Sequence, residues 1–447
     1  MSAKLLIAAL SLCLLQSGLV QGISLSLGDI TLFNVNFKTP TFLGRSVAVD
    51  SNVRLENDVD PNIQEDSHLN TIQLISKYGY PAENYTVQSD DGYLLGLFRI
   101  ARPGALPVLL VHGLLDSSDT WVMMGPASSL GYMLYEQGYD VWMANVRGNT
   151  YSKRHVRYSA EDSDFWNFSF HEMGVYDLPA IIDFVLMQSG FGQLHYIGHS
   201  QGSTIFWILA SERPNYMEKI VMMQALAPVA FLTHCRSPIV NLVASQDTAV
   251  ASFLSSAGYN EFLPSNSVID QFKRYACRDI ISSSVCQSLF ITLFGFDGQQ
   301  VNQTMLPIVV GHTPAGASIR QMHHYGQLRN SGKFQQFDYG LLNFLHYGSL
   351  SPPPYELEKV KAKVAIYYAK NDWLAPPEDV DMLFNRLPNV VEKYLVPNEN
   401  FNHFDLVWGR DAKRILWYRM LRVMQSVVPY SYHNDIDSIT AVFVNRF

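Results

Sequence analysis

Charged residues are scarce in this sequence, and the basic ones form no cluster. Asp, Glu, Lys and Arg together make up 16% of the 447 residues, and the formal net charge is −8. A pI near 5.9 without clustered Lys and Arg excludes a groove that binds a phosphate backbone, so we expect no nucleic-acid partner. Hydrophobic residues reach 48% and aromatic residues 13%, which excludes a disordered chain and favours apolar ligands.

Long hydrophobic runs are also missing, which argues against an integral membrane segment. The longest apolar run, Leu5 to Leu15, is well short of the ~20 residues that span a bilayer. It follows Lys4 and precedes the small-residue exit Val20-Gln21-Gly22, which is the pattern of a signal peptide over residues 1–22. A single membrane anchor is the alternative that this short run disfavours. We therefore expect an exported protein that begins near Ile23, in a secreted or lysosomal compartment.

Cysteines are few, and none stands at metal-binding spacing. Loss of Cys13 with the signal peptide leaves Cys235, Cys277 and Cys286. Export permits disulfides, and we favour a bond between Cys277 and Cys286, which flank a short segment, with Cys235 free. Three buried reduced thiols are the alternative. His234 beside Cys235 lacks a second pair of ligands at zinc spacing, so we expect no metal.

Composition and hydrophobic periodicity change along the chain, and these changes predict several segments. Residues 23–67 are mixed and then acidic, without a sustained helical or strand period, and resemble a leader or propeptide. Residues 68–230 and 355–429 carry apolar runs separated by helical stretches. Residues 231–354 lose this rhythm and are mostly helical, aromatic and Met-bearing, as expected of an inserted cap. The tail, residues 430–447, has no assignable pattern.

The apolar runs predict a mostly parallel sheet. Fully buried parallel strands are continuous apolar stretches, and helical crossovers separate them. Val108–Val111 is the candidate for a fully buried strand. Five further short apolar runs are strand candidates: Tyr139–Asn145, Leu194–Gly198, Ile220–Leu226, Val364–Tyr368 and Val391–Val396. Asp91-Gly92 between two β-rich runs marks a hairpin before them, and a helix is expected at about 411–426. The predicted fold class is α/β.

The pentapeptide Gly198-His199-Ser200-Gln201-Gly202 predicts a nucleophilic serine. It matches G-x-S-x-G, a sharp turn between a strand and a helix from which the serine hydroxyl protrudes. An apolar strand candidate precedes it, and a helix candidate follows it, as the turn requires. Glycine is needed at positions 198 and 202 because strand and helix approach closely there.

A serine hydroxyl needs a base to take its proton and a carboxylate to orient that base. Asp372 follows the strand Val364–Tyr368, and His403 follows the next strand, which gives the order serine, acid, histidine of an α/β-hydrolase. Rivals for the acid are Asp379 and Asp381, expected as solvated carboxylates on a helix, and Asp405, expected to cap a turn. His433 in the tail is the rival base. We expect structural roles for His199, His323 and His324.

The negative oxygen that develops during acyl transfer needs fixed N–H donors. The residue after the nucleophile, Gln201, supplies one, and the loop after the first parallel strand supplies the other. In His112-Gly113-Leu114-Leu115 the backbone N–H of Leu114 is our choice, and His112 is expected to shape the loop.

Three tripeptides match the acceptor sequence for N-glycosylation. They begin at Asn84, Asn167 and Asn302. Such sequons are consistent with an exported chain, although each arises often by chance.

Long stretches of the chain resemble the acid lipase family that includes gastric lipase and lysosomal acid lipase. The matching stretches lie between about Leu69 and Gln425: Tyr78–Pro81, His112–Leu115, Asn145–Ser152, Phe165–Met173, Tyr176–Ala180, Gly198–Gly202, Pro314–Ser318, Ser331–Gln335, Asn371–Ala375 and Phe401–Asp405. The resemblance implies an α/β-hydrolase core with a helical cap and lid. It also implies hydrolysis of triacylglycerols or cholesteryl esters at a lipid–water interface, without metal or cofactor.

The resemblance also assigns roles to single positions. It implies that Ser200 is the nucleophile, Asp372 the acid and His403 the base, with Leu114 and Gln201 as the backbone oxyanion donors. The spacing of Cys277 and Cys286 is similar to that of the family's disulfide in the lid region. Hydrolysis of small soluble esters is the competing activity, and a non-catalytic lipid carrier is disfavoured because the triad is intact.

Overall fold

The structure of the chain is a computed structural model that describes residues 26–27, 30–31, 61–245, 260–263, 300 and 302–427. The signal peptide, Cys277, Cys286, His433 and the tail from 430 onward lie outside the described residues, so what the sequence predicts for them stays a prediction.

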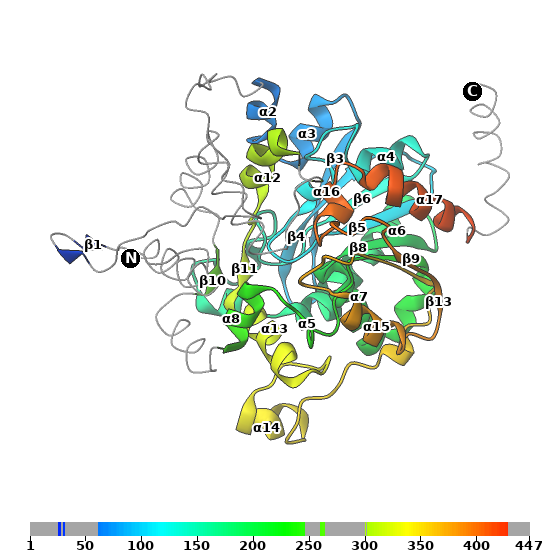
Figure 1. Cartoon of the computed structure of the whole chain (residues 1–447). Helices are drawn as coiled ribbons and strands as arrows, with labels where there is room; N and C mark the ends of the chain where they lie inside the picture. The colour runs from blue at the N-terminus through cyan, green and yellow to red at the C-terminus, as the bar shows by residue number, and fades with distance from the viewer. Residues whose placement is uncertain are drawn as a thin grey trace, which may run out of the picture.

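A nine-stranded sheet forms the centre of the described chain (Figure 1). Its main path runs β13-β12-β9-β8-β5-β6-β4-β3, and β7 pairs with β4. Six strands are parallel to their neighbours, β13, β12, β9, β8, β5 and β6, whereas β3, β4 and β7 form an antiparallel edge. The bounds are β3 (Ala82–Gln88), β4 (Tyr93–Ile100), β5 (Pro107–Val111), β6 (Asp140–Ala144), β7 (Arg154–His155), β8 (Leu194–His199), β9 (Ile220–Leu226), β12 (Val364–Tyr368) and β13 (Val390–Leu395). Outside this sheet β1 (Ser26–Leu27) pairs with β2 (Ile30–Thr31), and β10 (Glu261–Phe262) pairs with β11 (Ala317–Ser318).

Strand β5 is apolar at every position because both faces of the sheet are covered there. In β5, Leu109 and Val111 belong to one buried cluster, while Val108 and Leu110 belong to another on the opposite face. Side chains alternate across a strand, so a strand buried on both sides needs an unbroken apolar run. The sequence located all six parallel strands to within a residue, including β13, an edge strand that contains Glu392 and Lys393 and is only partly buried.

Helices cover both faces of the sheet. The first cluster includes side chains of α6 (Leu178–Ser189), α7 (Gln201–Glu212) and α15 (Pro377–Phe384). The second includes those of α3 (Thr71–Lys77), α4 (Leu130–Glu136), α12 (Leu306–His312), α16 (Asp405–Trp408) and α17 (Tyr418–Gln425). Among the described residues no helix has both the length and the apolar character to cross a membrane.

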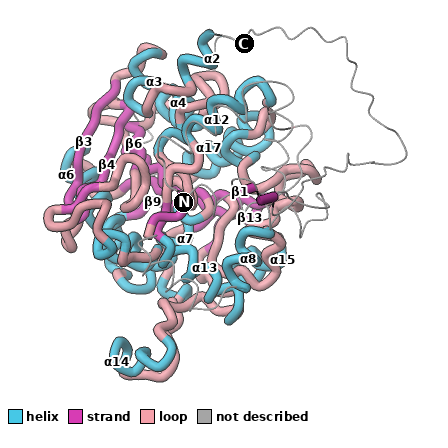
Figure 2. The backbone as a smooth tube through the Cα atoms, turned by 90° about the vertical axis from the view of Figure 1, so that its left-hand side faces the viewer, coloured by secondary structure: helices cyan, strands magenta, loops and turns pink. Residues whose placement is uncertain are grey.

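A long segment leaves the sheet between β9 and β12, two strands that pair directly through Met223 and Val364. Its described helices are α8 (Pro238–Ser245), α12, α13 (Ile319–Ser331) and α14 (Asn343–Tyr347). Both views show α14 standing away from the body of the molecule (Figures 1 and 2). The short α5 (Phe170–Glu172) and a π-helical turn, Met173–Asp177, precede α6.

The end of the acidic stretch forms a helix that the sequence pattern did not predict. Helix α2 (Pro61–Asp66) lies beside α12, and Asp66 is only 3% exposed. Its carboxylate accepts hydrogen bonds from Lys77 Nζ, at 2.6 Å, and from the Tyr78 hydroxyl. An acidic stretch without periodicity predicts no packed helix. This helix packs against the fold because the buried carboxylate of Asp66 is paired with Lys77. How far a leader extends before it stays a prediction.

Candidate active site

Ser200 lies in a sharp turn between β8 and α7. Its backbone has φ +51° and ψ −116°, a conformation that costs free energy for any residue other than glycine. The turn is held in place because Ser200 N–H donates to the carbonyl oxygen of Leu226, at the end of the neighbouring strand β9, over 2.9 Å. Ser200 is 8% exposed, so the strained turn presents a nearly buried hydroxyl.

The two glycines around Ser200 are required by steric contact. A Cβ atom at Gly198 would lie 2.7 Å from the backbone of Gly202, and one at Gly202 would lie 2.2 Å from the carbonyl oxygen of Val111 in β5. Backbone atoms of a buried strand and helix cannot move aside cheaply. Helix α7 therefore begins directly against β5 only because both positions lack a side chain.

Asp372 and His403 meet as the sequence order predicts. Asp372 follows β12, and its Oδ2 lies 2.7 Å from His403 Nδ1. Its Oδ1 accepts hydrogen bonds from the backbone N–H groups of Leu374 and Ala375, both at 2.8 Å. Both partners are almost fully buried. The carboxylate thus fixes the orientation of the imidazole, and His403 Nε2 has no hydrogen-bond partner among the described residues.

His199 joins the serine turn to the histidine loop. Its Nε2 lies 3.0 Å from the carbonyl oxygen of His403, and the two rings are 4.9 Å apart. Because a carbonyl only accepts, Nε2 must carry the proton and donate it. Burial holds the pKa of His199 well below its ordinary value, so the ring stays neutral. These contacts agree with the structural role that the sequence predicts for it.

The loop after β5, where Leu114 lies, is held by the buried ring of His112. His112 Nδ1 lies 2.8 Å from the Gly113 carbonyl oxygen, and its Nε2 accepts a hydrogen bond from Val146 N–H at 3.3 Å. Burial lowers the pKa of His112 to about 4, which keeps the ring neutral and able to accept. Leu115 has a positive φ of 61°, and its carbonyl oxygen accepts from Ala315 N–H at 2.7 Å. His112 therefore shapes the loop, as expected.

The side chain of Gln201 is clamped by the inserted segment. Its Oε1 accepts hydrogen bonds from Gln321 Nε2 and, at 3.1 Å, from the Tyr325 hydroxyl, both on α13. Its Nε2 faces Met173 Sδ in the π-helical turn at 3.5 Å. Sequence reasoning missed this clamp because Gln201 and Gln321 are 120 positions apart and nothing in either stretch marks the pairing.

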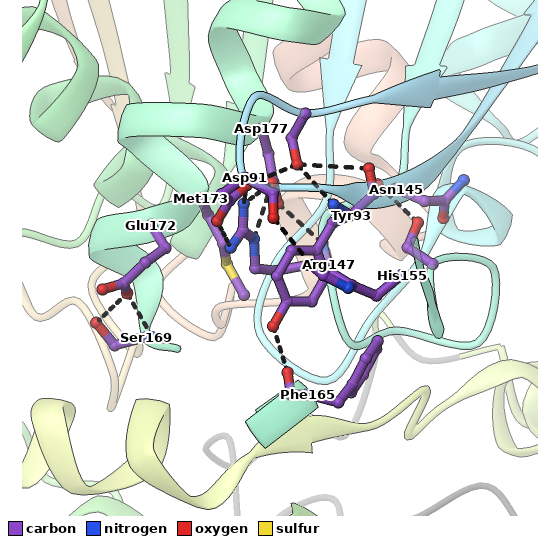
Figure 3. Close-up of polar contacts among 12 residues, drawn as sticks. Asp91, Tyr93, Asn145, Arg147, His155, Phe165, Ser169, Glu172, Met173 and Asp177 are labelled. Carbon is purple, nitrogen blue, oxygen red and sulfur yellow. Dashed lines mark hydrogen bonds and ion pairs between the residues drawn. The ribbon is translucent and has the colours of Figure 1, made fainter. Parts of the chain in front are cut away.

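Arg147 is a buried arginine that joins three segments beside the π-helical turn Met173–Asp177 (Figure 3). The sequence pattern did not predict this role. Arg147, in the loop after β6, donates to both carboxylate oxygens of Asp91 at 2.6 and 2.8 Å. It also donates to Asp177 Oδ1 from Nε and Nη2, at 2.8 and 2.6 Å, and its guanidinium lies 3.9 Å from the ring centre of Tyr93. The cluster fixes the π-helical turn that carries Met173. In the sequence Asp91 indicates only a hairpin.

The rival acids are bonded elsewhere, and one expectation about them was wrong. Asp379 is not solvated: it is 3% exposed and accepts from the backbone N–H of His234 at 3.0 Å and faces its Nδ1 at 2.8 Å. Burial raises its pKa, and the contacts with His234 oppose that rise. Asp381 forms a surface ion pair with Lys393. Asp405 accepts from Asn402 N–H at 2.7 Å, in agreement with a capping role.

Cys235 is buried and free. Its thiol donates to the carbonyl oxygen of Trp373, next to Asp372, and burial raises its pKa to about 12, so the reactive thiolate is disfavoured. Among the sequons, Asn84 and Asn167 are exposed and Asn302 is partly exposed, so glycosylation at these positions stays a prediction. The described residues contain no group of three or more His, Cys, Asp or Glu side chains that could hold a metal ion.

Comparison with known proteins places this chain in a family. Residues 107–409 match the alpha/beta hydrolase fold family, and residues 71–125 match the partial alpha/beta-hydrolase lipase region. The chain therefore belongs to the α/β-hydrolase family.

Similar proteins narrow the class to lipases. The chain is 41% identical over 370 residues to Lipase 1 of Drosophila melanogaster, and the aligned region covers 82% of each chain. It is 37% identical to mouse gastric triacylglycerol lipase, over 80% of this chain and 92% of the relative. It is also 37% identical to human lysosomal acid lipase/cholesteryl ester hydrolase, over 82% and 92%. The chain is a member of the acid lipase family, as its motifs predict.

Proposed function

We propose that this protein hydrolyses the carboxylic ester bonds of neutral lipids, triacylglycerols and cholesteryl esters, through an acyl-enzyme formed on Ser200. The observation that carries the proposal is the buried 2.7 Å contact between His403 Nδ1 and Asp372. It leaves His403 Nε2 without a hydrogen-bond partner among the described residues, and the carbonyl oxygen of His403 lies 3.0 Å from His199 in the serine turn. Two relatives are named for these substrates, gastric triacylglycerol lipase and lysosomal acid lipase/cholesteryl ester hydrolase.

In the proposed reaction His403 Nε2 takes the Ser200 proton as the hydroxyl oxygen attacks the ester carbonyl carbon. The carbonyl oxygen becomes negative and is stabilised by the N–H groups of Leu114 and Gln201. His403 then gives its proton to the leaving alcohol, and the acyl group stays on Ser200. Water, deprotonated by the same nitrogen, releases the fatty acid and restores the serine. Asp372 stabilises the imidazolium throughout.

We further propose that residues 231–354 form a cap over this site. The segment leaves the sheet between two adjacent strands, and its helix α13 contacts Gln201 next to the nucleophile. We also propose that this protein is exported and is either secreted or lysosomal. Residues 1–22 have the pattern of a signal peptide, and two relatives are named gastric and lysosomal lipases.

A substrate panel on the purified mature protein tests the proposal. Emulsified triolein and cholesteryl oleate should be hydrolysed at least as efficiently as a dissolved short-chain ester, with Ser200→Ala as the inactive control. A marked preference for the dissolved ester would contradict the lipid substrate. Absence of turnover on all three, with lipid binding retained, would instead indicate a carrier.

A further inference from the structure

An exposed apolar cluster lies on the segment around α14. Five large hydrophobic side chains between positions 341 and 350 face solvent: Leu341 is 95% exposed, Leu345 and Leu350 79%, Phe344 62% and Leu342 53%. We call residues 339–351 the projecting loop. Single exposed apolar residues are ordinary on proteins, but a group of this size on one protrusion indicates an interaction surface (Figures 1 and 2).

The projecting loop satisfies its polar groups internally. Asp338 Oδ1 accepts from Gly340 N–H at 2.8 Å and from Asn343 Nδ2 at 2.7 Å. Asn343, only 2% exposed, also accepts from Tyr339 N–H at 2.8 Å and donates to the Leu350 carbonyl oxygen at 3.1 Å. The loop therefore has a polar interior and an apolar exterior. Its outer side chains can therefore be buried in an apolar phase while these polar groups keep their hydrogen bonds. Burying a polar group without a hydrogen bond would cost free energy.

The base of the loop carries aromatic rings with polar atoms and is anchored to the site. Tyr339 stacks on His346 at 3.8 Å, and the Tyr347 hydroxyl donates to the Phe337 carbonyl oxygen at 2.7 Å. Arg320 of α13 donates to the Tyr339 hydroxyl, and it precedes the residue that clamps Gln201. Amphipathic aromatic rings of this kind favour the boundary between water and an apolar phase.

We infer that the projecting loop is a docking surface for an uncharged lipid–water interface, into which its leucines and Phe344 insert. Residues 339–355 contain no Asp, Glu, Lys or Arg, so no formal charge on the loop must be desolvated, and its charge matches a neutral lipid surface. A second protein copy is a poorer occupant, since a stable interface uses roughly 20–30 residues a side. The inference rests on the proposed function, which places the substrate at such an interface.

Flotation with phosphatidylcholine-coated triolein droplets tests the inference on the full mature chain. Ser200→Ala serves as background, so that hydrolysis does not alter the droplets. The double variant Leu341→Ser, Leu345→Ser should weaken droplet binding at least tenfold, because each leucine loses most of its transfer free energy. Met187→Ser is the matched control, since Met187 is 68% exposed on α6, away from the loop, and it should bind within twofold of the background.

Second measurements separate the possible failures. Thermal unfolding checks that the double variant is folded. If the double variant does not fold, the single variants Leu345→Trp and Met187→Trp are compared instead. Brominated phosphatidylcholine should quench the fluorescence of the tryptophan at position 345 and should not quench that of the tryptophan at position 187. Equal droplet binding by the double variant and its background overturns the inference, as does a change from dimer to monomer with droplet binding unaltered. The proposed function is tested separately by measuring hydrolysis of a dissolved ester with the protein that retains Ser200. If this protein does not hydrolyse the ester, its binding to droplets can still be measured.

Discussion

Replacement of Gly202 by alanine should damage both the rate and the stability of this protein. The new Cβ would lie 2.2 Å from the Val111 carbonyl oxygen and 2.9 Å from the Val111 carbonyl carbon. Real Cβ atoms stay at least 3.0 Å from such atoms, so helix α7 must retreat from β5 by at least 0.8 Å, the difference between 3.0 and 2.2 Å. The first turn of α7 holds the Gln201 N–H and follows Ser200 directly, so both reacting groups move.

The size of the effect follows from that displacement. A shift of about 1 Å in a catalytic group costs on the order of 10²-fold in rate. Forcing an extra methyl group into a packed core costs about 1–3 kcal/mol, whereas the intrinsic helix propensity of alanine alone would stabilise by about 1 kcal/mol. We expect kcat on a dissolved ester to fall about a hundredfold and Tm to fall by several degrees.

Gly192→Ala is the matched control for this variant. Gly192 lies in a surface loop, and no atom comes within 4 Å of a Cβ added there. It should keep the wild-type kcat and Tm in the same assays. If Gly202→Ala also keeps both values, helix α7 does not require the close approach to β5, and the steric reasoning about the serine turn is refuted.

Three further variants test other parts of the site. Asp372→Asn should lower kcat by about 10⁴-fold. The backbone donors at its Oδ1 hold the amide oxygen away from His403, whose Nδ1 then meets an NH2 group and takes the wrong tautomer; wild-type kcat would contradict this. Gln321→Ala should reduce kcat about tenfold at unchanged KM, because Gln201 loses a clamp; a change in KM alone would contradict positioning. Burial lowers the pKa of His195 to about 3, so the unfolded chain binds a proton below about pH 6.5 that the folded chain refuses. His195→Leu should therefore raise stability by roughly 1.4 kcal/mol more for each pH unit from 6.5 down to 4, and thermal unfolding with no such trend would exclude this origin.

The sequence predicted the sheet closely because burial leaves a local pattern. Ile220–Leu226 and Val364–Tyr368 are strands with the predicted bounds, since strands covered on both faces are mostly apolar, and Gln224 is the only polar amide in the two runs. The Asp372–His403 pairing was also accessible, because chain order and strand ends place both residues at the same edge of a parallel sheet.

Contacts between distant segments left no such pattern. The bonds of Gln201 to α13 and of Arg147 to Asp91 and Asp177 join residues 30 to 124 positions apart, and hydrophobic periodicity does not report on them. Asp379 was expected in solvent because it lies on a helix with other acids, yet His234 from another segment buries it.

Exposure at the projecting loop could not be predicted either. The apolar residues of α14 have the composition of a buried cap helix, and periodicity cannot distinguish a helix that packs inward from one that faces solvent.

Covalent trapping of the nucleophile tests the central claim most directly. A fluorophosphonate ester should form one adduct, which mass spectrometry of the digested protein would locate on Ser200. The adduct should be absent in Ser200→Ala and form more slowly by orders of magnitude in His403→Ala. An adduct on another residue, or labelling of Ser200 at an unchanged rate without His403, would contradict the proposed triad.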